Sequence, residues 1–106
     1  MLTISDYDDL LNKSSKDPSK LFVIDFKALW CGPCKLIHPY IEELSNSYTD
    51  VNFVEIDVDD LEHEKTVDVF GISAMPTFVF YKNNQVLDTV CGANKEEIFN
   101  TLQKNL

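Results

Sequence analysis

Apolar residues along this chain recur with two periods, one typical of strands and one typical of helices. Residues 21–26 form a nearly continuous apolar run, as expected for a strand that is covered on both faces. In residues 52–58, Val54, Ile56 and Val58 alternate with their neighbours, which predicts a second strand. Three more strands are expected at residues 2–4, 77–81 and 85–91.

Helical spacing marks most of the segments between these strands. Tyr7, Leu10 and Leu11 fall on one face of a helix. Ser5 is its expected N-cap, and the pair Asp17-Pro18 ends it. The other expected helices are a long one from the cysteines toward Tyr48 with a kink at Pro39, one over residues 61–69 that Gly71 ends, and one capped by Asn94 with Ile98, Phe99 and Leu102 buried.

The order of these elements indicates the α/β class, because strands and helices alternate along the chain. The pair Asn83-Asn84 tolerates positive φ, which predicts a hairpin turn between the last two strands. The chain has 106 residues, of which 44% are hydrophobic, and it contains no internal repeat or linker. We therefore expect one domain over residues 1–106.

The charge balance is strongly acidic, with 18 Asp and Glu residues against nine Lys residues and a formal net charge of −9. A negative overall field and the lack of arginine disfavour nucleic-acid binding. No stretch approaches the ~20 apolar residues of a membrane span, and no export signal is visible. The missing export signal and the presence of only three cysteines favour a cytoplasmic protein whose thiols stay reduced.

The most informative segment is Trp30-Cys31-Gly32-Pro33-Cys34-Lys35, where the strand over residues 21–26 runs into the long helix. Two thiols at this spacing can close and reopen a small disulfide ring, which predicts thiol–disulfide exchange. Half of a zinc site has the same spacing, so a metal site is the alternative, with His38, His63 and Cys91 as candidate further ligands. Because the proline between the cysteines favours a redox ring, we expect no metal.

The chain resembles the thioredoxin family over nearly its whole length. The matching segments are Phe26-Lys27-Ala28-Leu29-Trp30, Cys31-Gly32-Pro33-Cys34-Lys35, Pro39, Val58-Asp59-Asp60, Gly71-Ile72, Met75-Pro76-Thr77 and Gly92-Ala93-Asn94-Lys95-Glu96. The acidic turn and the last of these segments resemble those of cytosolic, eukaryotic-type members. The resemblance implies a mixed five-stranded β-sheet flanked by four α-helices, and a protein-disulfide reductase with its redox centre at the start of the second helix.

Position at a helix start assigns different roles to the two thiols. Unpaired backbone N–H groups and the helix dipole stabilise negative charge at Cys31, which is expected to attack a substrate disulfide. Cys34, one turn into the helix and more shielded, is expected to resolve the mixed disulfide. The resemblance gives Asp25 the role of proton partner of Cys34, and burial is expected to raise the pKa of its carboxyl.

The resemblance also implies a substrate-docking surface around Cys31. We expect the Met75-Pro76 peptide bond to be cis, so that the Met75 backbone faces the dithiol and pairs with an extended substrate segment. The resemblance further implies an indole hydrogen bond from Trp30 to Asp59. The expected docking residues are Trp30, Gly32, Pro33, Met75, Pro76 and Gly92.

His38 and Glu55 are candidate modulators of the centre. His38 stands where relatives often carry Lys, and it is either a pH-sensitive neighbour of Cys34 or a half-exposed bystander. Glu55 is expected to lie near Asp25. The unusual Lys27 is expected to face solvent.

Asp59 and Cys91 are the other candidate modulators. Asp59 acts through its expected bond to Trp30, or is only a solvated member of an acidic turn. Cys91 is either a small buried residue of a strand or an oxidisable regulatory thiol next to Gly92.

The resemblance also implies the partners. No cofactor is expected to be bound, and the electron donor is an NADPH-dependent flavoprotein, a thioredoxin reductase. Disulfide-containing proteins such as peroxiredoxins or ribonucleotide reductase are the expected substrates of a monomeric chain that binds neither nucleic acid nor membrane. The alternative is a thioredoxin-like scaffold or subunit of a larger complex whose main role is non-catalytic binding.

Overall fold

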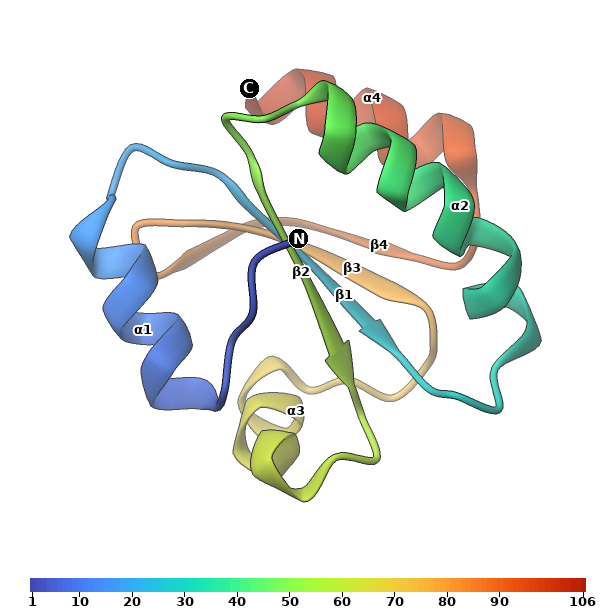
Figure 1. The fold of residues 1–106 in the computed structure, drawn as a ribbon, viewed down its shortest axis with the longest axis horizontal. Helices are drawn as coiled ribbons and strands as arrows, with labels where there is room; N and C mark the ends of the chain where they lie inside the picture. The colour runs from blue at the N-terminus through green and yellow to red at the C-terminus, as the bar shows by residue number, and fades with distance from the viewer.

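The computed structural model describes residues 1–106, and its centre is one β-sheet of four strands in the order β2-β1-β3-β4 (Figure 1). The strands are β1 (Phe22–Lys27), β2 (Asn52–Asp57), β3 (Thr77–Lys82) and β4 (Gln85–Cys91). β1 pairs in parallel with β2 and antiparallel with β3, and β3 forms a hairpin with β4. The turn of this hairpin has positive φ at Asn83 (50°) and Asn84 (58°), as expected from their residue types.

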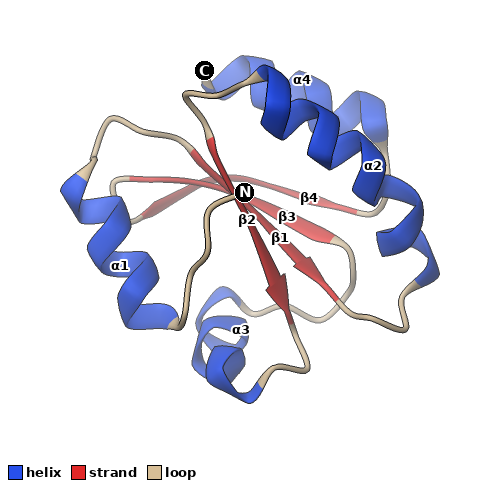
Figure 2. Ribbon diagram, in the orientation of Figure 1, coloured by secondary structure: helices blue, strands red, loops and turns tan.

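Four α-helices cover the sheet, in agreement with the α/β class. They are α1 (Tyr7–Lys16), α2 (Gly32–Ser47), α3 (Glu64–Phe70) and α4 (Lys95–Asn105), and a 3-10 turn η1 (Leu61–His63) precedes α3. The segment expected to be one helix is therefore a 3-10 turn followed by a shorter α-helix. Figure 2 shows α2 and α4 on one face of the sheet and α1 and α3 on the other. None of the helices is both long and apolar enough to span a membrane.

The expected fifth strand at residues 2–4 is wrong. Leu2 forms only an isolated parallel bridge to Val54, and its N–H donates to the Phe53 carbonyl at 2.9 Å. The Thr3 carbonyl accepts a hydrogen bond from Lys13 Nζ at 2.8 Å rather than from a neighbouring strand. Because α1 begins a few residues later, too little extended chain remains to build a ladder beside β2.

The strand alternation of β1 divides the core into two clusters on opposite faces of the sheet. Val23 packs in the cluster that contains Ile37 and Ile41 of α2. Ile24 packs in the cluster that contains Leu10 of α1. Asp25 follows the alternation of Val23 and therefore lies on the α2 face, where an apolar residue would otherwise be expected.

The N-cap of α1 is Asp6 rather than the expected Ser5. Asp6 Oδ1 accepts a hydrogen bond from the Asp9 backbone N–H at 2.8 Å. The Ser5 backbone N–H in turn donates to Asp9 Oδ2 at 2.9 Å. The two bonds satisfy donors at the start of the helix in the reciprocal manner of a capping box, shifted by one residue from the expected position.

The last helix begins at the expected N-cap, but one of the three residues expected to be buried is exposed. Asn94 is the N-cap of α4, and its Oδ1 accepts a hydrogen bond from Glu97 N–H at 3.0 Å. Ile98 and Leu102 are fully buried, as expected. Phe99 is 38% exposed, so its expected burial is wrong. Its position next to Ile98 turns it away from the buried stripe.

Candidate active site

The two cysteines lie where β1 ends and α2 begins, at the teal end of α2 in Figure 1. Cys31 is the N-cap residue of α2, and its Sγ accepts a hydrogen bond from the Cys34 backbone N–H at 3.2 Å. Pro33 lies in the first turn, where its missing N–H costs no intrahelical bond. A disulfide joins Cys31 to Cys34, whose Cα atoms are 5.3 Å apart.

Both cysteines are shielded to the same extent, since each is 5% exposed. The expected greater shielding of Cys34 is therefore wrong for the disulfide form. Gly32 and Pro33 between them are exposed. The difference between the two sulfurs lies in their bonding, because only Cys31 Sγ receives a backbone N–H donor at the positive end of the helix dipole.

The loop that precedes β3 approaches the disulfide. Met75 packs against the small cluster that Ala28 forms with the two cysteines. The Met75-Pro76 peptide bond is cis, and the Pro76 carbonyl accepts a hydrogen bond from the Gly92 N–H at 2.8 Å. Gly92 has φ 99°, a backbone conformation that residues with a Cβ atom rarely adopt. Residues from two distant loops are thereby held together beside the redox pair.

Trp30 and Asp59 form the hydrogen bond that the resemblance implied. Trp30 Nε1 donates to Asp59 Oδ2 at 2.8 Å, although the indole is 68% exposed. The Asp59 backbone N–H donates to Asp57 Oδ1 at 2.9 Å, which holds the acidic turn in place. Leu29 and Leu61 are also largely exposed, so this region offers apolar surface that sequence reasoning missed.

Asp25 is buried on the α2 face of β1, with 3% of its surface exposed. Its neighbours in strand register are Glu55 on β2 and Phe78 on β3. Burial, and to a lesser extent the Glu55 charge, raise the pKa of Asp25 to about 7 against the opposing effect of the Lys27 charge. Asp25 Oδ1 has no hydrogen-bond partner in the protein, and no direct hydrogen bond joins Asp25 to Cys34.

Lys27 and His38 both approach Glu55. Lys27 Nζ lies 2.6 Å from Glu55 Oε2, and His38 Nδ1 lies 3.3 Å from the same oxygen. The expectation that Lys27 faces solvent is therefore wrong. The available signal was the strand alternation, which places Lys27 two residues after Asp25 on the same face. His38 Nε2 also lies 3.0 Å from Glu42 Oε1, so the imidazole connects α2 to β2.

Cys91 is a free, exposed cysteine at the end of β4. Of the two alternatives for Cys91, the small buried residue is therefore wrong, because β4 is an edge strand and its side chains are mostly exposed. The only side chain in hydrogen-bond contact with its sulfur is Thr77, whose Oγ1 lies 3.8 Å away.

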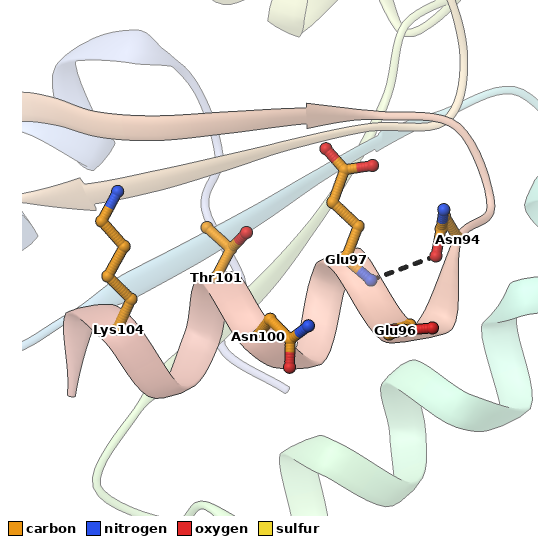
Figure 3. Close-up of a pocket in the computed structure, with 6 residues that line it drawn as sticks. All are labelled: Asn94, Glu96, Glu97, Asn100, Thr101 and Lys104. Carbon is orange, nitrogen blue, oxygen red and sulfur yellow. Dashed lines mark hydrogen bonds between the residues drawn. The ribbon is translucent and has the colours of Figure 1, made fainter.

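Of the surface hollows, one reaches the redox centre. It has a volume of about 230 Å³ and is lined by Lys27, Ala28, Leu29, Cys34, Lys35 and His38. A larger hollow of about 440 Å³ runs along α4 (Figure 3), where Glu97, Thr101 and Lys104 project from the helix. No hydrophobic residue and no cysteine lines the larger hollow, whereas Cys34 lines the smaller one.

Comparisons with known proteins agree with this geometry. The thioredoxin family model matches residues 1–104. Thioredoxin of Ophiophagus hannah is 42% identical over 101 residues, which cover 95% of this chain and 94% of that protein. The structure of Fasciola hepatica thioredoxin superposes with a TM-score of 0.93 at 34% identity, covering 100% of both chains.

A third relative comes from a structural study of the thiol-resolving mechanism in yeast mitochondrial 1-Cys peroxiredoxin via glutathione/thioredoxin systems. One of its chains superposes with a TM-score of 0.87 at 32% identity, covering 98% of this chain and 94% of that chain.

The chain belongs to the thioredoxin family. Its Cys31–Cys34 disulfide makes it a protein-disulfide oxidoreductase that acts as a disulfide reductase. Of the two interpretations of the cysteine spacing, family membership and the observed disulfide support thiol–disulfide exchange.

Proposed function

We propose that Cys31 is the attacking thiol and Cys34 the resolving thiol of a protein-disulfide reductase. The Cys31 thiolate attacks one sulfur of a partner disulfide, a bond forms between them, and the other partner sulfur leaves as a thiolate. Cys34 then attacks Cys31 Sγ, the second partner sulfur leaves, and the Cys31–Cys34 disulfide forms. Two electrons pass to the partner. The observation that carries this assignment is the backbone N–H donated to Cys31 Sγ at the start of α2.

Asp25 is the proton acceptor for the second step. Cys34 must lose its proton before it can attack, and a carboxyl with a pKa raised to about 7 can take up and release a proton at neutral pH. Because the protein has no direct bond between the two groups, the proton passes through intervening water. The burial of Asp25 on the α2 face supports this role.

The docking surface for partner disulfides consists of residues that surround Cys31. Their exposure or their contact with the cysteine cluster supports this proposal: Trp30, Gly32 and Pro33 are exposed, and Met75 packs against the cysteines. An extended partner segment pairs with the backbone of this surface. The complete set is Trp30, Gly32, Pro33, Met75, Pro76 and Gly92.

An NADPH-dependent thioredoxin reductase re-reduces the disulfide, and the substrates are disulfide-containing proteins. Peroxiredoxins are one such class, because a related chain belongs to a study of a peroxiredoxin and the thioredoxin system. Ribonucleotide reductase is another. The chain acts as a cytoplasmic monomer, which its low cysteine content supports.

A coupled assay tests the function directly. The protein, a eukaryotic thioredoxin reductase, NADPH and insulin are mixed, and NADPH oxidation is followed. The wild type and the matched control Cys91→Ser should sustain oxidation, while Cys31→Ser should reduce it to the rate without the protein. Equal rates for Cys31→Ser and the wild type would contradict the function and favour the non-catalytic scaffold.

Cys91 is a regulatory thiol in this proposal. Its exposure beside Gly92 supports access by an oxidant. Mass spectrometry after mild peroxide treatment should find Cys91 converted to an oxidised or intermolecularly disulfide-bonded form. Complete protection of Cys91 under these conditions would rule out the regulatory role.

A further inference from the structure

We propose that Lys27 is a positioning residue for the resolving step, because its ion pair with Glu55 fixes where this second carboxylate sits relative to Asp25. The inference rests on the proposed function, in which Asp25 accepts the proton of Cys34. It adds a residue that neither the family match nor the motif around the cysteines assigns to that step.

The sheet register places the three side chains on one face. Glu55 is the register partner of Asp25 across the parallel β1–β2 pair, and Lys27 follows Asp25 by two residues on β1. The register partner of Lys27 is Asp57. Lys27 is therefore the only cation that β1 and β2 contribute beside Asp25 on this face.

The other elements around Asp25 add few charges. From α2, Cys34 lies in the first turn, and His38 reaches Glu55 with its Nδ1 at 3.3 Å. From β3, the register partner of Asp25 is the apolar Phe78. The balance at Asp25 is consequently set by Glu55, which disfavours a second negative charge, and by Lys27, which favours it.

Lys27 fixes this balance through geometry as well as charge. Glu55 Oε2 lies 2.6 Å from Lys27 Nζ, and both side chains are largely shielded, at 28% and 21% exposed. His38 Nδ1 lies 3.3 Å from the same oxygen on the helix side, and His38 Nε2 lies 3.0 Å from Glu42 Oε1. Without Lys27, the Glu55 carboxylate keeps only His38 beside it, and the favourable effect of the Lys27 charge on the Asp25 anion is lost.

The position of Lys27 at the hollow beside Cys34 connects this pair to the reaction. Lys27 and His38 line the hollow of about 230 Å³ that also has Cys34 in its wall. The Lys27 charge therefore acts both on Asp25, two residues away on the same face of β1, and at the wall of the hollow that Cys34 lines. A change of this charge alters how readily Asp25 accepts the proton.

The test compares pH profiles of disulfide reduction in single turnover by the pre-reduced protein. Lys27→Met should move the midpoint of the profile to higher pH by about one unit, because the anionic form of Asp25 loses a favourable charge. Glu55→Gln should move the midpoint to lower pH. Lys27→Arg, which keeps the cation, should restore the wild-type profile. Lys82→Met is the charge-matched control and should leave the profile unchanged, because Lys82 ends β3 next to Tyr81, the register partner of Phe22 at the start of β1.

The pKa of Asp25 can be measured separately in the same variants from the NMR chemical shift of its side-chain carboxyl carbon. This pKa should shift in the same direction as the kinetic midpoint in each variant. An unchanged midpoint in Lys27→Met, whatever Glu55→Gln shows, would overturn the role of Lys27, and a lost pH dependence in Asp25→Asn would then leave the role of Asp25 intact. A wild-type profile in Asp25→Asn would instead overturn the proton relay itself. If Lys27→Met does not fold, an unshifted Glu55→Gln alone overturns the inference.

Discussion

Asp25 is the one residue of β1 whose burial places a carboxyl group among apolar side chains, which costs free energy when that group is ionised. Burial removes the carboxyl from water, and Oδ1 gains no hydrogen bond in return. The pKa of Asp25 therefore rises from its ordinary value of 3.8 to about 7 in the folded protein. Between these values the unfolded chain has lost a proton that the folded chain keeps. The stability that this proton confers is fully present below pH 4 and is lost as the pH rises toward 7.

Asp25→Asn should remove this pH dependence, because an amide does not ionise. The difference of about three pKa units corresponds to at most about 4 kcal/mol, so at pH 8 the free energy of unfolding should rise by about 2 to 4 kcal/mol. The gain should shrink by the same amount toward pH 4. Urea unfolding of the oxidised proteins measures both values.

The control for this prediction is Asp50→Asn, which removes an exposed carboxylate and should behave like the wild type at both pH values. If Asp25→Asn and the wild type have equal free energies of unfolding at pH 8, the ionised Asp25 does not destabilise the fold. That result would contradict the prediction.

The spacing of Cys31 and Cys34 predicted the redox pair from the residues themselves, whereas the role expected of Asp25 came from the resemblance, and the residues predicted only that its burial would raise its pKa. The sequence did not predict the partner of Lys27, because a long flexible side chain can reach several carboxylates. Only the register of β1 and β2 shows that this carboxylate belongs to Glu55. The sequence also left the exposure of Cys91 open, because a strand position is buried or exposed according to the neighbours that cover it.

At the scale of elements, α1 shows why a boundary is harder to predict than a helix. Ser5 and Asp6 are both good N-caps, and they are adjacent in the sequence. The choice depends on which backbone becomes extended before the first turn, and Asp6 does so with φ −160° and ψ −176°. The fifth strand failed because only a few residues separate residues 2–4 from the start of α1 at Tyr7, and Leu2 forms a single bridge to Val54.

Asp6→Ala should lower the free energy of unfolding by about 1 kcal/mol, because it leaves the Asp9 N–H without its side-chain acceptor. Ser5→Ala is the matched control. It keeps the backbone N–H that bonds Asp9, so it should cost less than about 0.5 kcal/mol. Chemical denaturation at neutral pH measures both. A larger cost for Ser5→Ala than for Asp6→Ala would show that Ser5 provides the cap.

At the scale of the whole molecule, the sheet separates two hydrophobic clusters, and we expect them to unfold as one unit. Ile41 of α2 belongs to one cluster and Ile24 of β1 to the other, and both are fully buried. The continuous run over residues 21–26 predicted a strand covered on both faces, and the helices on the two faces provide that cover. The hydrophobic pattern therefore predicted the layers of the fold better than the edges of its elements.

Ile24→Val and Ile41→Val should each lower the free energy of unfolding by about 1 kcal/mol through loss of one buried methylene group. The double variant should lose the sum of the two within about 0.5 kcal/mol, because the sheet keeps the two sites from sharing partners. Denaturant unfolding followed by both tryptophan fluorescence and circular dichroism measures this. Separate transitions for the two probes would contradict a single cooperative core.

The most direct test of the assigned chemistry is to trap the intermediate between the protein and its substrate. Pre-reduced Cys34→Ser cannot resolve the mixed disulfide, so incubation with insulin should accumulate a covalent adduct that peptide mapping locates at Cys31. Cys31→Ser should accumulate no such adduct, and Cys91→Ser should turn over like the wild type. An adduct on Cys91, or one that forms through Cys34 in Cys31→Ser as readily as through Cys31, would contradict the account.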